Sequence, residues 1–327
     1  MDRREFLKSA VAAASGITLS GVAATETATA SNSSILTANC LWGAFADPVS
    51  GQTDAQAYLA LESKIGRKFA LTRQYVSWDA DLPGRVARWS ASNGRIPYIS
   101  FKAIHSNGNA VRWGAIASGS LDAYVRQQAE RMRTWGHFAY VSFHHEPEDD
   151  PDCGSPSDFQ AAYAHIRKIF EAHNVNVRWV CALMASTYDG GNGGYRRWLP
   201  PAYDMIGVDG YNRFPCEPKR TNHPWKSFTS LFGSANAAAG MQNKPLFIAE
   251  IGCVEQDACG YSNGDRLAKA KWFTAMGETL KSWPRARAAI YSNTTLMHDG
   301  YPMNYRVTSS TASLAAYKKT GFQASFM

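Results

Sequence analysis

Short runs of apolar, β-branched and aromatic residues alternate with amphipathic stretches from Cys40 onward. Eight of these runs have the length and composition of strands: residues 40–46, 69–78, 96–103, 139–146, 177–184, 205–211, 246–252 and 288–293. Helical patterns lie between them, over residues 54–65, 85–92, 121–135, 157–173, 225–239 and 266–283. A strand followed by a helix, repeated along one chain, is typical of βα units around a parallel sheet.

The number of units predicts how the sheet is arranged. Eight strands in one series favour a closed (β/α)8 TIM barrel over an open sheet, because closure leaves no unpaired strand edge. Polar residues suited to capping precede three of the helices, at Thr53, Ser120 and Ser155. The second unit has the weakest pattern, since its helix at 85–92 is short. No repeat, low-complexity tract or linker marks a second module, so we expect a single domain.

The first 30 residues have the features of an export signal. The paired Arg3 and Arg4 are followed by Phe-Leu-Lys, by an Ala/Gly/Ser-rich stretch, and finally by Ala-Thr-Ala at 28–30. This order is typical of a twin-arginine signal peptide with a small-residue cleavage site. A membrane anchor is the alternative, but a span needs about 20 mostly apolar residues, and serine, threonine and glycine interrupt this stretch. We therefore predict a signal peptide at 1–30, a mature domain at 31–327 and a secreted protein without a membrane partner.

The charge of the chain narrows the class of partner. Lysine and arginine total 34 against 27 acidic residues, a formal net charge of +7. The basic residues are scattered, with no run of five or more, so the charge does not predict nucleic-acid binding. We expect it to promote solubility and weak adsorption to an anionic cell wall, and we expect the protein to be a monomer.

Six cysteines are too few for a disulfide framework to hold a chain of 327 residues together. Export into an oxidising compartment still allows individual pairs to form. Cys253 and Cys259, which follow the seventh strand, are predicted to form a small disulfide, and Cys153 with Cys216 is a second candidate pair between loops. Two further cysteines lie within predicted strands and are expected to be buried thiols: Cys40 and Cys181.

Two glutamates stand at the ends of predicted strands on opposite sides of the barrel. Glu146 ends the fourth strand, in Phe-His-His-Glu-Pro, and Glu250 ends the seventh, in Phe-Ile-Ala-Glu-Ile-Gly. Active sites of such barrels lie on the loops at the carboxyl ends of the strands. Glycoside hydrolysis requires one carboxyl group to protonate the leaving oxygen and another to attack or to activate water. An isolated glutamate at a strand end is more often a salt-bridge partner, but the facing pair predicts a glycoside hydrolase.

The position of the two glutamates resembles the clan of retaining barrel glycosidases, whose acid/base and nucleophile lie at the ends of strands four and seven. His145 stands where most of that clan has asparagine, and this His-Glu pair is similar to glycoside hydrolase family 26, which includes β-mannanases, mixed-linkage β-glucanases and β-1,3-xylanases. The resemblance rests on three motifs: His-His-Glu-Pro at 144–147, Gly-Val-Asp-Gly-Tyr-Asn at 207–212 and Ala-Glu-Ile-Gly at 249–252. It implies a retaining, endo-acting enzyme that cleaves β-mannan or β-glucan without a metal or other cofactor.

The same resemblance implies a role for each residue of the site. Glu146 is the expected acid/base and Glu250 the expected nucleophile. His145 is expected to contact the reacting sugar, and Tyr211 to donate a hydrogen bond to the nucleophile. Physical arguments agree, because hydrogen bonds from Tyr211 and from Arg73 on the second strand would lower the pKa of Glu250. The charge of Glu250 would in turn raise the pKa of Glu146.

The chain departs from the family pattern in two places. Residues 147–153 read Pro-Glu-Asp-Asp-Pro-Asp-Cys where the family places glycine and aromatic residues, and the eighth strand lacks the tryptophan that many clan members place beneath the reacting sugar. Another aromatic side chain must then stack on the sugar. Positions at strand ends favour Trp42, Trp78 and Tyr211, and the following loops offer Trp113 and Trp198. Core packing is the alternative for each of the tryptophans.

Weaker signals leave other interpretations open. His105 is either a donor to a sugar hydroxyl or a solvated loop residue, and Asp209 is a further candidate for substrate binding. The acidic run at 148–152 lacks the spacing of a calcium loop, which favours a solvated loop.

Two other functional classes remain as alternatives. A metal-dependent hydrolase would use four ligands: His105, His144, His145 and Asp209. Metal barrels of that kind usually carry a His-x-His pair on the first strand, which reads Cys-Leu-Trp-Gly-Ala here. A non-catalytic carbohydrate-binding barrel is the second alternative, and the two intact carboxylates argue against it.

Overall fold

The computed structural model describes residues 40–213, 224–258, 264–298, 301–323 and 326. Within these segments, eight parallel strands close into a barrel in chain order, with the last strand pairing the first. The strands are β1 (Leu41–Ala46), β2 (Leu71–Val76), β3 (Ile96–Phe101), β4 (Ala139–Phe143), β5 (Val177–Met184), β6 (Met205–Asn212), β7 (Leu246–Cys253) and β8 (Ala286–Asn293). Residues 1–30 lie outside the described segments, so the signal peptide stays a prediction.

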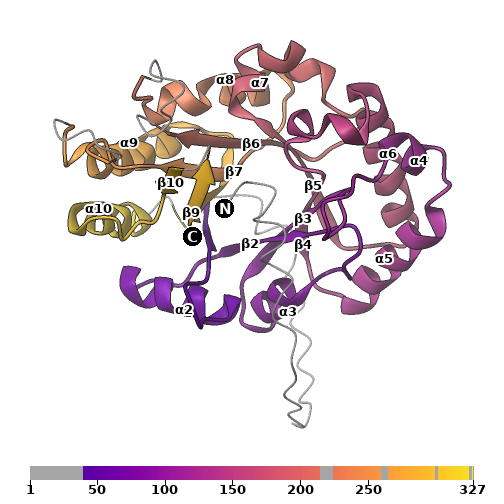
Figure 1. Ribbon diagram of the computed structural model, residues 1–327, viewed down its shortest axis with the longest axis horizontal. Helices are drawn as coiled ribbons and strands as arrows, with labels where there is room; N and C mark the ends of the chain where they lie inside the picture. The colour runs from indigo at the N-terminus through magenta and orange to yellow at the C-terminus, as the bar shows by residue number, and fades with distance from the viewer. Residues whose placement is uncertain (1–39, 214–223, 259–263, 299–300, 324–325, 327) are drawn as a thin grey trace, which may run out of the picture.

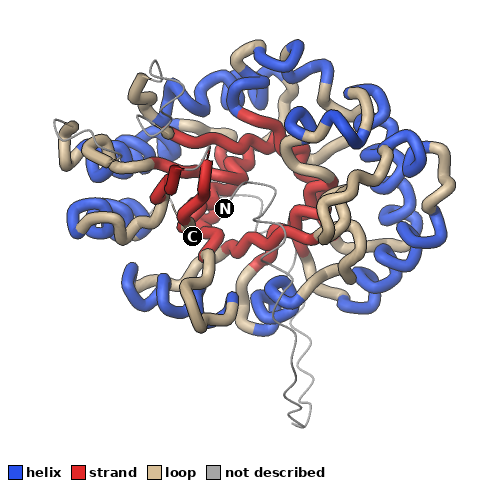
Figure 2. The backbone as a smooth tube through the Cα atoms, in the orientation of Figure 1, coloured by secondary structure: helices blue, strands red, loops and turns tan. Residues whose placement is uncertain are grey.

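Helices surround the ring of strands (Figures 1 and 2). They are α2 (Asp54–Ile65), α3 (Arg85–Ser92), α4 (Trp113–Ala117), α5 (Asp122–Trp135), α6 (Pro156–Ala172), α7 (Ala185–Tyr188), α8 (Phe228–Met241), α9 (Ala268–Ser282) and α10 (Thr311–Gly321). The predicted single-domain (β/α)8 barrel is confirmed, and α2 and α3 have the predicted bounds. No helix in the described segments is long and apolar enough to cross a bilayer.

Capping explains where several helices begin. The Thr53 side chain accepts a hydrogen bond from Gln56 N, and the Gln56 side chain accepts one from Thr53 N, which closes a capping box at the start of α2. Ser155 caps α6 in the same way, as predicted. The predicted cap at Ser120 is wrong, because its hydroxyl instead donates to Ala115 O at 2.7 Å and closes the turn after α4.

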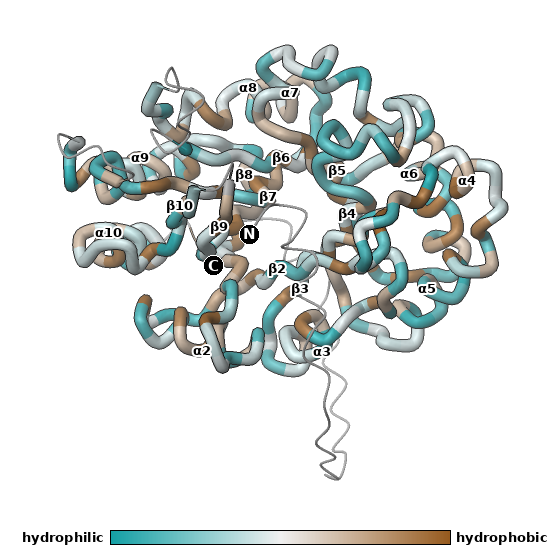
Figure 3. Tube along the Cα trace, in the orientation of Figure 1, coloured by the Kyte–Doolittle hydropathy of each residue, from teal (hydrophilic) through white to brown (hydrophobic). Residues whose placement is uncertain are grey.

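The core has two layers, because alternate residues of each strand face opposite sides of the barrel wall. One cluster fills the inside of the barrel and includes Leu41, Tyr98, Phe247 and Ile290. A larger cluster lies between the strands and the helices. Hydrophobic and hydrophilic positions alternate along the helices (Figure 3). The interior is tight: a Cβ at Gly43 would lie 2.5 Å from Leu71 Cβ.

A hairpin that the sequence pattern did not predict closes one side of the barrel mouth. Strands β9 (Thr295–His298) and β10 (Tyr301–Asn304) pair antiparallel, directly after β8. Leu296 of β9 reaches the cavity described below. The hairpin therefore adds a wall to the mouth beyond the eight βα units.

Among the described residues, the cysteines predicted to form disulfides are free thiols. Cys253 is a free, buried thiol whose Sγ lies 3.5 Å from Asn212 Nδ2, and Cys153 is a free, buried thiol whose Sγ lies 3.5 Å from Ala103 O. Their expected partners, Cys259 and Cys216, lie outside the described residues. Burial raises the pKa of each of these two thiols to about 12. The prediction of buried thiols is confirmed at the other two sites, Cys40 and Cys181.

Candidate active site

A cavity of about 500 Å³ opens at the carboxyl ends of the strands. Seven of the eight strands or the turns that follow them contribute to its lining, through Phe45, Tyr75, Lys102, Glu146, Tyr211, Glu250 and Ser292. Both predicted catalytic glutamates therefore lie in one cavity, at the end of the barrel where sites of this fold are found.

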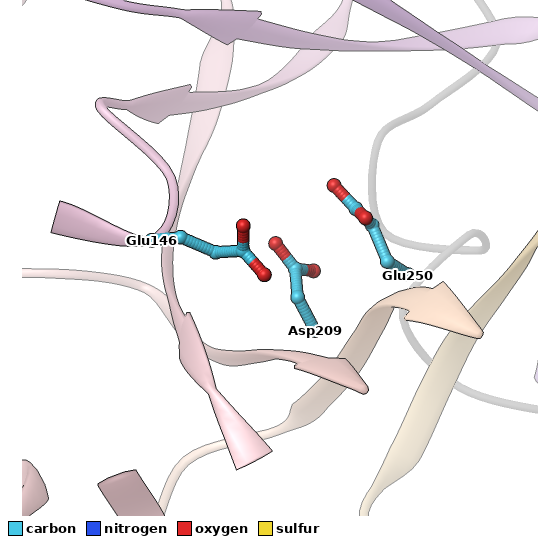
Figure 4. Close-up of side chains that lie close together, drawn as sticks. All are labelled: Glu146, Asp209 and Glu250. Atoms are coloured by element: carbon cyan, nitrogen blue, oxygen red, sulfur yellow. The ribbon is translucent and has the colours of Figure 1, made fainter. Parts of the chain in front are cut away.

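Three carboxylates converge at the base of this cavity (Figure 4). Glu146 follows β4, Asp209 belongs to β6 and Glu250 to β7. One carboxylate oxygen from each lies within 4.8 Å of the other two. All three residues are buried, with exposed fractions of 5% for Glu146, 2% for Asp209 and 4% for Glu250.

Backbone conformation after β4 brings Glu146 to this point. The strand ends at Phe143, three residues earlier than predicted. His144 and Glu146 both have left-handed backbone, with φ of 50° and 49°, which is uncommon for residues other than glycine. Glu146 N still donates to Ala182 O of β5 at 2.9 Å, so the segment stays attached to the sheet while it turns. Such local strain is often found at functional sites, where the surrounding contacts maintain it.

An irregularity in β7 places Glu250. The pairing register of β7 with β8 shifts between Ile248 and Ile251, and the register of β6 with β7 shifts at Val208 and Asp209. Bulges of this kind change the direction of a side chain relative to regular alternation. Glu250 consequently pairs with Asp209 in register, and the two carboxylates lie side by side.

Three donors hold the carboxylate of Glu250. Arg73 Nη2 lies 2.8 Å from Oε1, and the Tyr75 hydroxyl donates to the same oxygen at 2.9 Å. The Tyr211 hydroxyl donates to Oε2. A cation and two hydroxyl donors favour the ionised form of a carboxyl group. The sequence indicated Arg73 and Tyr211 but missed Tyr75, although it lies two residues beyond Arg73 and so on the same face of β2.

The Arg73 guanidinium is buried and charged. Its side chain is fully buried, and Nη1 contacts the Ala249 carbonyl oxygen and, at 3.4 Å, Asp209 Oδ1. Burial alone would lower the pKa of Arg73, but the negative charge of Glu250 and its neighbours raises it well above the ordinary value. A permanent positive charge therefore lies directly behind the carboxylates.

Asp209 differs from its two neighbours in its access to solvent. It does not line the cavity. Burial raises its pKa well above the ordinary value, the charge of Glu250 adds to the effect, and Arg73 opposes it. These effects favour the protonated form of Asp209, and a proton there would reduce the charge repulsion among the three carboxyl groups.

The imidazole of His145 is held between Ser100 and the cavity. Its Nδ1 lies 2.7 Å from Ser100 Oγ, and Arg73 Nη2, which can only donate, lies 3.5 Å from the same hydroxyl. Ser100 can accept from Arg73 and donate to Nδ1, an arrangement that leaves the proton of a neutral imidazole on Nε2. This Nε2 lies 3.9 Å from Glu250 Oε1 and faces the cavity. Ser100 is a second residue that the sequence analysis missed.

Comparison of the sequence with known proteins finds a distant relative. No protein-family model matches the chain. Endoglucanase H from Acetivibrio thermocellus is 25% identical over 292 residues, which is 83% of this chain and 29% of that protein. The chain therefore spans less than a third of the length of this relative.

Solved structures with the same fold include several mannanases. A GH26 β-mannanase from Bacteroides ovatus has a TM-score of 0.57 at 12% identity, covering 90% of this chain and 91% of its own. Bacillus subtilis mannanase has a TM-score of 0.56 at 13% identity, covering 88% and 86%. A β-mannanase from a symbiotic protist of the termite Reticulitermes speratus, in complex with a gluco-manno-oligosaccharide, has a TM-score of 0.53 at 15% identity, covering 90% of each chain. At these identities the likeness shows the fold, and a fold alone does not assign a function.

The tryptophans predicted to stack on sugar are buried elsewhere. Trp42 is 1% exposed and packs against Tyr317 and Phe326 on the outer side of the barrel wall. Its neighbours in β1 face the barrel interior, which turns Trp42 toward the helices. Trp78 packs flat against Phe101 with ring centroids 5.1 Å apart.

The two loop candidates are also core residues. Trp113 is fully buried, and its Nε1 donates to His144 Nδ1 at 3.1 Å. Trp198 is 7% exposed and donates to Asn192 O at 3.0 Å. The four tryptophan candidates are therefore wrong, whereas the fifth candidate, Tyr211, lines the cavity together with the rings of Phe45 and Tyr75.

The ligand set of the metal-dependent alternative is not assembled. His105 does not line the cavity, and His144 is fully buried against Trp113, with its Nε2 on Asp150 at 2.9 Å. Within the described residues, the one close group of possible ligands is the three carboxylates at the cavity base. There the Arg73 guanidinium already contacts Glu250 and Asp209, so these carboxylates have a protein cation as their counter-charge.

The acidic run at 148–152 is only in part the solvated loop that was expected, because Asp149 and Asp152 are exposed but Glu148 and Asp150 are partly buried. It forms two short 3-10 helices, η1 (Pro147–Asp149) and η2 (Pro151–Cys153), along the cavity wall. Glu148 turns its carboxyl group inward, where Oε1 accepts from Met184 N at 3.0 Å and Oε2 is buried. Asp150 pairs with Lys102 at 2.6 Å. Residues distant in the sequence, Met184 and Lys102, hold this segment in place. The spacing of the acidic residues does not predict these contacts.

The buried carboxyl group of Glu148 should make the stability of the protein depend on pH. Burial raises its pKa from the ordinary 4.5 to about 8 in the folded protein. Between these values the folded chain keeps a proton that the unfolded chain has lost, so the free energy of unfolding should fall as pH rises. Glu148→Gln should weaken this fall in thermal unfolding between pH 5 and 8, whereas Glu171→Gln, at an exposed site on α6, should not. Equal slopes in all three proteins would contradict the assignment.

Proposed function

We propose that this protein is a retaining, endo-acting glycoside hydrolase that cleaves β-mannan or β-glucan by double displacement. The observation that carries the proposal is the separation of Glu146 and Glu250, whose nearest carboxylate oxygens lie within 4.8 Å. Retaining enzymes keep their two carboxyl groups about 5 to 5.5 Å apart, whereas inverting enzymes leave roughly 6.5–9.5 Å for a water molecule. The gap in this cavity suits direct attack by one carboxylate.

Glu250 is the proposed nucleophile. Arg73, Tyr75 and Tyr211 hold its carboxylate ionised and fix its orientation. In the first step, a Glu250 oxygen forms a bond to the anomeric carbon while the bond from that carbon to the leaving oxygen breaks. Formation of the glycosyl ester removes the charge of Glu250, and the donors then stabilise the carboxylate as it is released.

Glu146 is the proposed acid/base. In the first step it gives its proton to the oxygen of the departing sugar. In the second step it takes a proton from a water molecule, whose oxygen attacks the anomeric carbon and displaces Glu250. The change of role follows the charge of Glu250, because a nearby anion favours the protonated form of Glu146 and its loss favours the ionised form.

His145 and Asp209 are proposed to assist at the reacting sugar. His145 presents its Nε2 proton toward the cavity beside Glu250, where it can donate to a sugar hydroxyl. Asp209 lies beneath the two catalytic carboxylates and outside the cavity lining. We therefore assign it a role in positioning Arg73 and Glu250 rather than in direct sugar contact.

The choice of β-mannan or β-glucan is supported by the relatives, since the structural neighbours are named as mannanases and the sequence relative as an endoglucanase. The test is release of reducing sugar from mannan, mixed-linkage glucan, laminarin, xylan and arabinan. We expect hydrolysis of mannan or glucan, and loss of it in Glu146→Gln and Glu250→Gln. Activity of wild-type level in both variants would refute the proposal.

A further inference from the structure

One wall of the cavity carries an ion pair that the proposed mechanism does not use. Lys102 follows β3 and Asp150 joins η1 to η2, and both residues line the cavity. Lys102 Nζ lies 2.6 Å from Asp150 Oδ2. The Lys102 side chain is 10% exposed, so it is nine-tenths buried.

A rigid network holds the acidic partner. His144 Nδ1 accepts hydrogen bonds from Ala103 N at 3.2 Å and from Trp113 Nε1 at 3.1 Å. The proton of the ring is therefore on Nε2, which donates to Asp150 Oδ2 at 2.9 Å. Burial lowers the pKa of His144 to about 4, so the ring is neutral and the charge of Asp150 is balanced by Lys102.

The Lys102 ammonium group has more N–H donors than the described residues use. An ammonium group has three N–H bonds. Within the described residues, the Lys102 side chain is bonded to Asp150 alone, and it borders the cavity. A buried ammonium group with unused donors is costly unless an oxygen from water or a ligand completes its shell. Sugar hydroxyls supply such oxygens, and the hydroxyl proton can be accepted by the carboxylate beside them.

The charge of the lining excludes one class of sugar. Five carboxylates border the cavity, Glu146, Asp149, Asp150, Asp152 and Glu250, and Lys102 is the one lysine or arginine among the described lining residues. A uronate unit would bring a further negative charge to this wall and would be repelled. A neutral hexose carries hydroxyls without that charge.

We propose that Lys102 and Asp150 form a specificity-determining site that binds neighbouring hydroxyls of a neutral hexose on the leaving-group side of the scissile bond. We choose the leaving-group side because Asp150 lies on the segment that begins at Glu146, the residue proposed to protonate the leaving oxygen. The inference rests on the proposed function, because it needs a glycosidic bond between Glu146 and Glu250.

The test compares two kinds of substrate in purified Lys102→Met. The neutral polysaccharide places a sugar on the leaving-group side, whereas a dinitrophenyl β-glycoside of the same glycone does not. Loss of a hydrogen bond to a charged group costs about 1.5–3 kcal/mol, so kcat/KM on the polysaccharide should fall by roughly 10- to 100-fold. On the aryl glycoside kcat/KM should change less than about twofold. Arg167→Met, which removes a partly buried cation paired with Asp204 outside the cavity, is the matched control and should affect neither substrate.

A second arm tests the charge of the sugar. Mannan and polymannuronate share a backbone and differ in the carboxylate, and we expect polymannuronate neither to be cleaved nor to inhibit hydrolysis of the neutral polysaccharide. Equal losses on both substrates in Lys102→Met, or no loss on either, would overturn the proposed binding role. Inhibition by polymannuronate would overturn the preference for neutral sugar. A wild-type protein that cleaves no β-linked polysaccharide would instead refute the proposed function, and this inference with it.

Discussion

Glu250→Ala is expected to abolish hydrolysis of the polysaccharide, because in the proposed mechanism the Glu250 carboxylate attacks the anomeric carbon. Covalent catalysts that lose their nucleophile slow by a factor on the order of 10⁶, and we expect a loss of that scale. The folded protein should persist, because the substitution removes a side chain that borders a cavity. The measurement is kcat on the polysaccharide, with the unfolding temperature as a check of folding.

Azide should distinguish a lost nucleophile from a damaged site. The anion fits the space left by the carboxylate and can attack an activated aryl glycoside, so Glu250→Ala should regain activity and form a glycosyl azide of inverted configuration. Azide should not accelerate the wild-type protein in this way. A Glu250→Ala protein that is folded and still cleaves the polysaccharide would exclude Glu250 as the nucleophile.

Glu146→Ala is expected to impair mainly the hydrolysis of substrates whose leaving group must be protonated. General acid–base groups contribute about 10²- to 10⁴-fold, and we expect a loss in this range on the polysaccharide. A dinitrophenyl leaving group departs without protonation, so formation of the glycosyl-enzyme should be largely preserved on the aryl glycoside. The second step then becomes slow, and a burst of dinitrophenol should precede it.

Azide and pH provide the controls for Glu146→Ala. Azide needs no general base, so it should speed the second step and yield a glycosyl azide of retained configuration, opposite to the product from Glu250→Ala. The alkaline limb of the pH profile, which reports the acid/base, should disappear. Equal losses on the polysaccharide and the aryl glycoside would contradict this role for Glu146.

Much of the fold was predictable because the hydrophobic pattern and the helix caps in the sequence agree with the tertiary structure. The predicted bounds of β5 agree with the structure, and those of α2 agree where Thr53 forms a capping box. It was harder to predict which residues of a strand face the inside of the barrel and which face the helices. Trp42 was assigned to the site, but a shift of one residue moves a side chain across the barrel wall, and its true face depends on register with neighbouring strands.

The site was predictable where side chains project from strand ends and not where loops fold back. Arg73, Tyr211 and Glu250 come together because strands of one barrel end at one mouth. Tyr75 could have been found by the two-residue period of β2. The pairing of Asp150 with Lys102 joins loops after different strands, so no local pattern indicated it. The left-handed backbone of Glu146 is likewise set by contacts to β5 rather than by its own sequence.

The anomeric configuration of the first product tests the central claim most directly. In a retaining double displacement, two inversions at the anomeric carbon return the original configuration. Proton NMR during early hydrolysis of a β-linked oligosaccharide should therefore show the β anomer first, with the α anomer appearing only as the sugar mutarotates. Initial appearance of the α anomer would contradict attack by Glu250 and would require a water molecule between the two carboxylates.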